Sequence, residues 1–254
     1  MKFFLDTTDR RLPYVKVQLK KLGYKVEDFD FFDLDYICAG DYIIFSPAFK
    51  WTIELAKKIP TNTHVVCGNV DSEVLNIFQN NFIDYLNLMS SEEFVLKNAI
   101  LTSEGALADM IFYSSKSIFE ERTLILGGGR VAKAMACLLH KLGLDFDITM
   151  RNPDKLLEAE LVAKKCITWE SFKDKLCNYD IVINTIPQKL FDENDVEKFK
   201  INSSVFELAS KQCLEGIKTK DFSYILCPAL PSKYTPESAG KLIVDEIIKK
   251  FKGE

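Results

Sequence analysis

The sequence predicts an α/β protein with two Rossmann-like parallel-sheet domains joined by a long bridging helix. Three observations support this prediction. Short apolar strands alternate with helices through most of the 254 residues, a glycine-rich turn joins one such strand to a helix, and a long helical stretch separates two alternating regions. Alternation at this interval favours parallel sheets with helices on their faces. The chain is long enough for one large or two modest domains.

The first 90 residues are expected to form a small α/β domain on the substrate side of the protein. Gly23 ends the first helix, as glycine often does. Strands are predicted over 2–5, 24–26, 41–45 and 64–67, with helices from the first turn to about residue 22, over 51–58 and over 72–79.

A helical stretch over 91–117, interrupted at 98–105, is expected to bridge the two domains. The cleft that such a helix crosses is a natural ligand site. Residues 118–235 then form the second α/β domain, and a C-terminal helix over 236–251 closes the chain in the segment 236–254. The strands of the second domain are predicted from 123, over 146–150, 180–184, 204–208 and 224–227.

A dinucleotide-binding loop is predicted where the strand from Thr123 runs into Gly127-x-Gly129-x-x-Ala132. Gly127 permits the tight turn, Gly129 leaves the volume of a side chain to a pyrophosphate, and Ala132 lets the helix pack closely on the strand. The phosphates are expected against the N–H groups of the helix N-terminus, where the macrodipole favours negative charge. Other residues of this loop expected to contact the cofactor are Gly128, Arg130 and Val131.

The end of the following strand indicates which dinucleotide is preferred. An NAD-specific site normally has Asp or Glu there, about 20 residues after the glycines, to bind the ribose 2′-hydroxyl. Arg151 and Asn152 stand there instead. A guanidinium forms charge-assisted hydrogen bonds to a 2′-phosphate. We therefore expect NADP as the cofactor, with NAD as the alternative if Arg151 is only a solvated loop residue.

Polar or proline-containing runs follow three later strands of the second domain. Ligands of open α/β sheets bind outside the carboxyl ends of the strands, so these runs are expected to rim the nicotinamide half of the site. Taken alone, each run is equally typical of a turn or a solvated loop. The residues assigned to the cofactor in these runs are Thr185, Ile186, Pro187, Ala209 and Pro228.

The composition and charge argue against several other classes of protein. Asp and Glu (37) slightly outnumber Lys and Arg (33), so no basic field attracts nucleic acid or an anionic membrane. No apolar run approaches the length of a membrane span and no leader precedes the first strand, so a cytoplasmic protein is expected. The seven cysteines are scattered and the two histidines do not group with them, so we expect no metal site.

Five motifs occur in order between about residue 98 and the C-terminus. They are 101–106 (LTSEGA), 127–131 (GGGRV), 183–187 (INTIP), 208–211 (LASK), and 228–231 (PALP) with 235–240 (TPESAG). On these motifs the chain resembles the dipicolinate synthase A-subunit family of spore-forming bacteria. The N-terminal part matches more loosely, with residues 8–11 (TDRR) standing where the family has a Gly-Asp-x-Arg turn.

The resemblance implies the oxidation of dihydrodipicolinate to dipicolinate, with hydride transfer to NAD(P), during sporulation and beside a smaller flavoprotein-like B subunit. This reaction also removes a ring proton and needs groups that hold two carboxylates. Arg11 is expected to bind one carboxylate and Ser103 to add a second anchor, while Glu104 or Lys211 transfers the proton. The candidate catalytic residues are thus Glu104, Lys211 and Ser103, and the candidate substrate-binding residues are Asp9, Arg11 and Thr102.

The departures from the family pattern lie on the substrate side. The family's glycine-rich loop after the third strand is shortened at 45–50, and Thr8 and Ser232 stand where the family has glycine, with Lys233 and Tyr234 also departing. One alternative is an NADP-dependent reductase of another small carboxylate, resembling shikimate dehydrogenase, although no early Lys and Asp pair supports it. Another is a nucleotide-binding regulatory protein without turnover. The oligomeric state is open, with the helix over 242–251 or the bridging helix as a candidate dimer surface.

Overall fold

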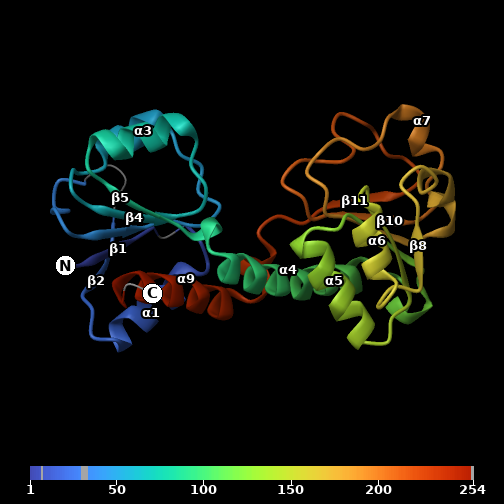
Figure 1. Ribbon diagram of the computed structural model, residues 1–254, viewed down its shortest axis with the longest axis horizontal. Helices are drawn as coiled ribbons and strands as arrows, with labels where there is room; N and C mark the ends of the chain where they lie inside the picture. The colour runs from blue at the N-terminus through green and yellow to red at the C-terminus, as the bar shows by residue number, and fades with distance from the viewer. Residues whose placement is uncertain (7, 30–33, 253–254) are drawn as a thin grey trace. The chain divides into compact units, whose positions relative to one another are not determined.

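The computed structural model describes residues 1–6, 8–29 and 34–252, and the chain divides into two compact units (Figure 1). The first unit comprises Met1–Asn98 together with the chain from Pro231 onward, and the second comprises Ala99–Leu230. The chain passes into the second unit within helix α4 (Glu92–Tyr113) and returns to the first within α8 (Leu230–Tyr234). Each unit holds its own parallel sheet, so the predicted fold class is confirmed.

The first unit contains a five-stranded parallel sheet with the strand order β2-β1-β3-β4-β5. Strands β1 and β3 are neighbours in the sheet. The chain leaves β1 toward β2 on one side and leaves β3 toward β4 on the other side, so the loops after β1 and β3 run in opposite directions. Such a topological switch point is where open α/β sheets bind their ligands. The strands are β1 (Phe3–Leu5), β2 (Val26–Asp28), β3 (Tyr42–Ile44), β4 (His64–Cys67) and β5 (Asp84–Asn87).

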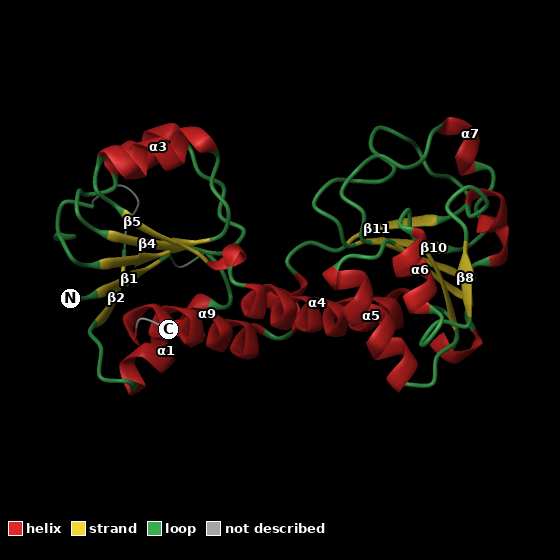
Figure 2. Cartoon of the chain, in the orientation of Figure 1, coloured by secondary structure: helices red, strands yellow, loops and turns green. Residues whose placement is uncertain are grey.

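Helices cover both faces of this sheet, as Figure 2 shows for α3 on one side and α1 and α9 on the other. Phe3 and Leu5 pack against α1, α9 and the start of α4, whereas Phe4 packs toward α2 and α3. Burial on both faces explains why the central strands are continuously apolar. The helices of this unit are α1 (Leu12–Lys21), α2 (Ile53–Lys58), α3 (Ser72–Asn80) and α9 (Pro236–Lys252), with a 3₁₀ turn at Leu88–Ser90.

The second unit contains a six-stranded parallel sheet with the order β11-β10-β9-β6-β7-β8. Its switch point lies between β6 and β9, and the order is the 3-2-1-4-5-6 arrangement of dinucleotide-binding folds, read from the β8 edge. The strands are β6 (Thr123–Leu126), β7 (Phe146–Thr149), β8 (Lys165–Ile167), β9 (Ile181–Asn184), β10 (Ser204–Glu207) and β11 (Ser223–Leu226).

The sheet of the second unit is also buried on both faces. On one face, α5 and the C-terminal part of α4 pack through Ala106, Met110 and Met135 against Phe206. On the other face, the connections around Phe172 bury a cluster of aromatic side chains. The remaining helical elements are α5 (Arg130–Lys141), α6 (Pro153–Ala159), α7 (Glu193–Val196), and 3₁₀ turns at Ile118–Glu120 and Lys173–Asn178.

Three local predictions are wrong. The expected break at 98–105 does not occur, because α4 contains no proline and the single Gly105 costs only about 1 kcal/mol relative to alanine. The second strand begins at Val26 because Gly23, at φ +89°, and Tyr24 close the first helix through hydrogen bonds to Lys20 and Leu19. The helical stretch predicted to reach residue 117 ends at Tyr113, and a separate 3₁₀ turn follows at Ile118–Glu120.

Candidate functional site

The predicted glycine loop lies at the switch point of the second sheet, between β6 and β9. Gly127 has φ +121°, and a Cβ atom there would lie 2.3 Å from Thr185 Oγ1. The Thr185 hydroxyl and N–H both donate to the carbonyl of Leu126, at 2.8 and 3.0 Å. Only glycine therefore fits at position 127, where the loop after β6 touches the loop after β9.

Open space adjoins Gly129, the N-cap residue of α5. A Cβ atom at Gly129 would meet no atom within 4 Å, whereas one at Gly128 would lie 2.4 Å from the Met150 sulfur. Ala132 is fully buried under the first turn of the helix. The N-terminal N–H groups and the helix macrodipole attract an anion to this space. The loop therefore fits the pyrophosphate of a dinucleotide, with Arg130 and Val131 in the first turn of α5.

Arg151 and Asn152 follow β7 and play different structural parts. The Asn152 side chain accepts a hydrogen bond of 3.1 Å from the Lys155 N–H and so caps α6. Arg151 is exposed, and its Cζ atom lies 4.9 Å from the ring centroid of Trp169. The guanidinium thus stays at the edge of the sheet where the ribose of a dinucleotide binds.

Glu207, at the end of β10, is a buried residue that the sequence did not single out. Its carboxylate accepts hydrogen bonds from Asn184 Nδ2 (2.7 Å), the Ala209 and Cys213 N–H groups (3.0 and 2.7 Å) and the Tyr224 hydroxyl (2.8 Å). Burial, together with the neighbouring thiol and carboxylate, raises the pKa of Tyr224. The carboxylate therefore fixes the backbone that follows β10. The one feature of the sequence that could have pointed to Glu207 is its position at the end of a predicted strand, four residues before the candidate Lys211.

The strand-end residues predicted to rim the cofactor site share one edge of the second sheet. Thr185 to Pro187 follow β9, Ala209 and Lys211 follow β10, and Pro228 follows β11. Lys211 and the two prolines are exposed or nearly so, whereas the other three side chains are half-buried. Since the strands are parallel, all of these residues leave the sheet at the same edge as the glycine loop.

Asp9 and Arg11 form a buried ion pair at the switch point of the first sheet. Arg11 donates from Nε to Asp9 Oδ1 at 2.9 Å and from Nη2 to Oδ2 at 2.6 Å. Ser46, which follows β3, donates to the same Oδ2 at 2.6 Å. Burial alone would raise the pKa of Asp9, but the hydrogen bonds and charge of Arg11, with the Ser46 hydroxyl, hold it well below its usual range.

Three of the departures from the family pattern contribute hydrogen bonds around this N-terminal turn. Ser232 Oγ donates to Asp9 Oδ1 at 3.0 Å, and Arg10 Nη1 donates to the Lys233 carbonyl at 3.0 Å. The N–H and hydroxyl of Thr8 both donate to the carboxylate of Asp6, at 2.8 and 2.7 Å. The turn is thus held by side chains that glycine would not supply.

The three candidates on the long helix lie in the part of α4 that belongs to the second unit. Ser103 is buried, and its hydroxyl donates to the Ile100 carbonyl at 2.7 Å within its own helix. Glu104 is exposed and Thr102 is half-buried. Consecutive helical residues point in different directions, so the three side chains do not share a face. The structure places these candidates in one unit and the Asp9–Arg11 pair in the other.

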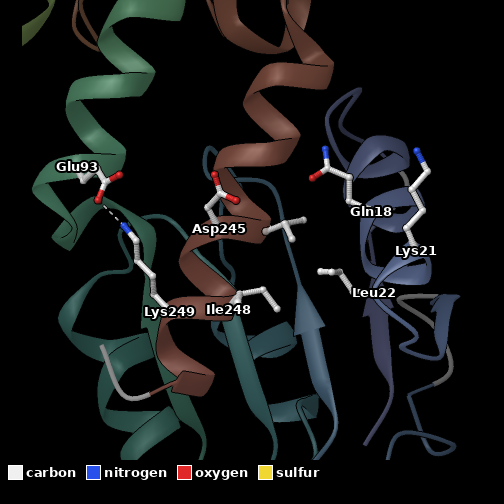
Figure 3. Close-up of a pocket in the computed structure, with 8 residues that line it drawn as sticks. Gln18, Lys21, Leu22, Glu93, Asp245, Ile248 and Lys249 are labelled. Carbon is white, nitrogen blue, oxygen red and sulfur yellow. Dashed lines mark hydrogen bonds and ion pairs between the residues drawn. The ribbon is translucent and has the colours of Figure 1, made fainter.

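A groove of about 510 Å³ lies elsewhere on the first unit (Figure 3). Its apolar lining comes from Leu22, the C-cap residue of α1, and from Val244 and Ile248 of α9, and the ion pair between Glu93 and Lys249 also borders it. It borders the C-terminal half of α1, whereas the Asp9–Arg11 pair precedes the N-terminus of that helix. The groove is therefore separate from the switch-point site. Its lining residues are Gln18, Lys21, Leu22, Glu93, Val244, Asp245, Ile248 and Lys249.

Among residues 1–6, 8–29 and 34–252, no three His, Cys, Asp or Glu side chains group closely enough to hold a metal ion. In the same described part of the chain, no helix combines the length and apolarity needed to span a bilayer. All seven cysteines are free thiols.

No protein-family model matches this chain. The dipicolinate synthase A-subunit of Bacillus subtilis (strain 168) is 22% identical over 195 residues, which span 76% of this chain and 66% of that relative, just under two thirds of its length. The crystal structure of the dipicolinate synthase A-subunit from Bacillus halodurans has a TM-score of 0.79 at 20% identity, covering 98% of this chain and 97% of the other. The chain is similar to the dipicolinate synthase A-subunit.

The fold shared with the dipicolinate synthase A-subunit also resembles that of dehydrogenases. The apo-structure of D-lactate dehydrogenase from Escherichia coli has a TM-score of 0.71 to this chain at 10% identity, covering 100% of this chain and 98% of the other. The resemblance carried by the five sequence motifs is confirmed as a similarity to the dipicolinate synthase A-subunit, and the two-domain fold is similar to that of D-lactate dehydrogenase.

Proposed function

We propose that this chain is an NADP-dependent oxidoreductase that oxidises dihydrodipicolinate to dipicolinate. The observation that carries the proposal is the loop from Gly127 to Gly129, which stands at the switch point of a 3-2-1-4-5-6 sheet with open space at the start of α5. NADP bound there would supply a nicotinamide ring that accepts hydride. Similarity to the dipicolinate synthase A-subunit supports the choice of substrate, and exposed Arg151 supports NADP over NAD.

The chain's own residues would bind and orient the substrate. In the described part of the chain, Nη1 of Arg11 has no protein acceptor, because Asp9 and Ser46 engage only Nε and Nη2. The pair holds the guanidinium plane in a fixed orientation, which lowers the entropy lost when Nη1 binds a carboxylate. Arg11 would therefore anchor one carboxylate of the substrate, with Asp9 as its positioning partner. Thr102 and Ser103 are the proposed additional substrate contacts, and the Ser103 hydroxyl would have to leave the Ile100 carbonyl to make its contact.

A proton must also leave the ring when the dihydropyridine becomes aromatic. Glu104 and Lys211 are both exposed in the second unit and are the proposed groups for this transfer. A positioned acid or base contributes about 10²- to 10⁴-fold to such a step. We expect Glu104→Gln or Lys211→Met to lower kcat by at least about 100-fold, and full turnover in both variants would contradict the assignment.

The cofactor part of the proposal is tested by titrating the protein with NADPH and with NADH and following thermal stability. A charge-assisted hydrogen bond to the 2′-phosphate contributes about 1–3 kcal/mol, so NADPH should bind about 5- to 150-fold more tightly. Equal affinities would remove the assignment of Arg151. Arg151→Gln provides the matched control, since it should weaken NADPH binding and leave NADH binding nearly unchanged.

The reaction is tested with freshly generated dihydrodipicolinate and NADP, by following the absorbance of dipicolinate. We propose that the family's flavoprotein-like B subunit is the partner, so the assay is run both with and without it. The resemblance also supports a role in sporulation, in the mother-cell cytoplasm. Turnover of another small carboxylate alone would instead indicate a reductase of the shikimate-dehydrogenase kind.

A non-catalytic, NADP-binding regulatory protein is the second candidate function. One observation favours it: both oxygens of Asp9 already neutralise Arg11, whose side chain is only 5% exposed. Tight NADPH binding without turnover of any dicarboxylate, with the B subunit present, would support this alternative. Substrate-dependent NADPH formation would exclude it.

A further inference from the structure

We infer that Trp169 is a positioning residue that sets the preference of this chain for NADP by holding Arg151 against the 2′-phosphate. The inference rests on the proposed binding of NADP and adds to it a residue that the glycine motif does not identify. Trp169 follows β8, and Arg151 follows β7, with Cζ 4.9 Å from the indole centroid.

The strand register brings these two side chains together. Thr149 pairs with Ile167 in the parallel ladder of β7 and β8, and Arg151 and Trp169 each lie two residues beyond these partners. They therefore leave the sheet at matching positions, at the edge where adenosine binds in dinucleotide-binding folds. This position follows from tertiary structure, since the two residues belong to the ends of different strands.

Neighbouring residues hold the indole in place. The Trp169 ring packs at 4.7 Å on Phe172, which is 1% exposed in the core of the second unit. The indole is itself only half-buried. Its inner side is thus anchored to the core, and it meets the guanidinium near the surface of the unit.

The guanidinium has a contact with an aromatic ring in place of a carboxylate partner. Among the described residues, no ion pair joins Arg151 to an Asp or Glu, and Asn152 uses its side-chain oxygen to cap α6. An arginine that stacks on an aromatic ring keeps its N–H donors for a planar or tetrahedral anion. The ligand chemistry that fits is a phosphate monoester on the ribose of adenosine.

The test uses two probes that lack nicotinamide, 2′,5′-ADP and 5′-AMP, with binding measured by calorimetry. The two differ only by the 2′-phosphate, and the wild-type chain should prefer 2′,5′-ADP. Trp169→Leu should reduce that preference about two- to fivefold, the range expected for an exposed cation–π contact, and Trp169→Phe should restore part of it. In the double variant with Arg151→Gln, the loss of the indole should have no further effect on the preference.

If Trp169 had only a structural role, Trp169→Leu would weaken the binding of both probes equally and leave the ratio of their affinities unchanged. An unchanged ratio in Trp169→Leu, with wild-type preference intact, would overturn the inference while the proposed function stands. Failure of the wild-type chain to bind either probe would overturn both. Trp51→Phe serves as the control, because it removes the other tryptophan from the first unit and should leave the ratio unchanged.

Discussion

Nδ2 of Asn184 donates a hydrogen bond of 2.7 Å to Oε1 of Glu207, and the two residues are paired partners at the ends of β9 and β10. The same amide also donates to the Ile186 carbonyl at 3.1 Å, while its oxygen accepts from the Ile186 N–H at 3.0 Å. One amide therefore connects the turn after β9 to the carboxylate that organises the loop after β10. The edge of the sheet assigned to the cofactor is held by this buried pair.

Glu207→Gln should destabilise the second unit. The carboxylate accepts two hydrogen bonds on each oxygen, so an amide nitrogen at either position would face two donors. An unsatisfied buried donor costs about 1–3 kcal/mol, and urea unfolding should show a loss of that size. Glu193→Gln, at an exposed position of α7, is the matched control and should change stability by less than about 0.5 kcal/mol. Equal stability of the two variants would contradict the role of Glu207.

Alanine at Gly127 should lower the stability of the protein, whereas alanine at Gly129 should lower its affinity for NADPH. At Gly127 the new Cβ would collide with Thr185 Oγ1 in a backbone conformation with φ +121°, so thermal unfolding should occur at lower temperature. At Gly129 the new Cβ meets nothing within 4 Å and φ is −78°, so the stability of the free protein should be nearly unchanged. NADPH should nevertheless bind Gly129→Ala at least about tenfold more weakly, because the methyl group fills space assigned to the pyrophosphate. Unaltered NADPH affinity in Gly129→Ala would show that the pyrophosphate lies elsewhere.

Asp9→Asn should reduce stability in a pH-dependent manner. The substitution leaves the buried Arg11 charge uncompensated, which costs about 3–5 kcal/mol at neutral pH. Because the pKa of Asp9 is lowered from its ordinary 3.8 in the folded state, its contribution is fully present above that value and is lost as the pH falls below it. Urea unfolding of the wild-type and Asp9→Asn proteins between pH 7 and pH 3 should show a difference in the free energy of unfolding that is constant at first and then becomes smaller as the pH falls.

A control for this prediction removes both charges. Asp9→Asn combined with Arg11→Met should recover much of the lost stability, since no buried charge remains unpaired. A stability gap that does not change with pH, or a double variant less stable than Asp9→Asn, would show that the ion pair is not the cause.

Gly68→Ala should destabilise the first unit more than the loss of a nearby hydrogen bond. A Cβ at Gly68 would lie 1.9 Å from the Pro47 carbonyl oxygen. Because this oxygen belongs to the backbone, it cannot rotate away as a side-chain atom would. We expect a loss of about 1–3 kcal/mol or more in urea unfolding. Tyr85→Phe, which removes only the hydroxyl that donates to the Gly68 carbonyl, should cost about 1 kcal/mol. A Gly68→Ala protein as stable as wild type would mean that the two loops separate easily.

The features that could be predicted from the sequence are local ones. The span of β4 is the predicted one because three of its four residues are apolar and buried, and the glycine turn is contained within six residues. Strands β5 and β8 were missed because their residues are partly exposed edge positions with polar side chains. Which unit holds the candidates on the long helix could not be predicted, because this depends on the residue at which α4 passes from one unit to the other.

Contacts between distant segments were equally inaccessible. Ser232 reaches Asp9 across 223 residues, through a return of the chain that no local pattern indicates. Glu207 has no motif of its own and gains its donors only when β9, β10 and β11 align. Trp169 meets Arg151 because of the β7–β8 register. In each case the partner is set by tertiary structure, which the periodicity of a single sequence does not determine.

The first unit is built from two segments that lie on either side of the second unit in the sequence, and this has a consequence for synthesis on the ribosome. The second unit is continuous from Ala99 to Leu230 and can complete its sheet as soon as that stretch has emerged. The first segment of the first unit is made earlier but cannot complete its core, since Phe3, Leu5 and Val15 lack part of their cover until Ile243 and Ile247 of α9 are translated. The unit whose synthesis starts earlier is therefore the later of the two to mature, and a nascent chain would expose part of this apolar face throughout the translation of the second unit.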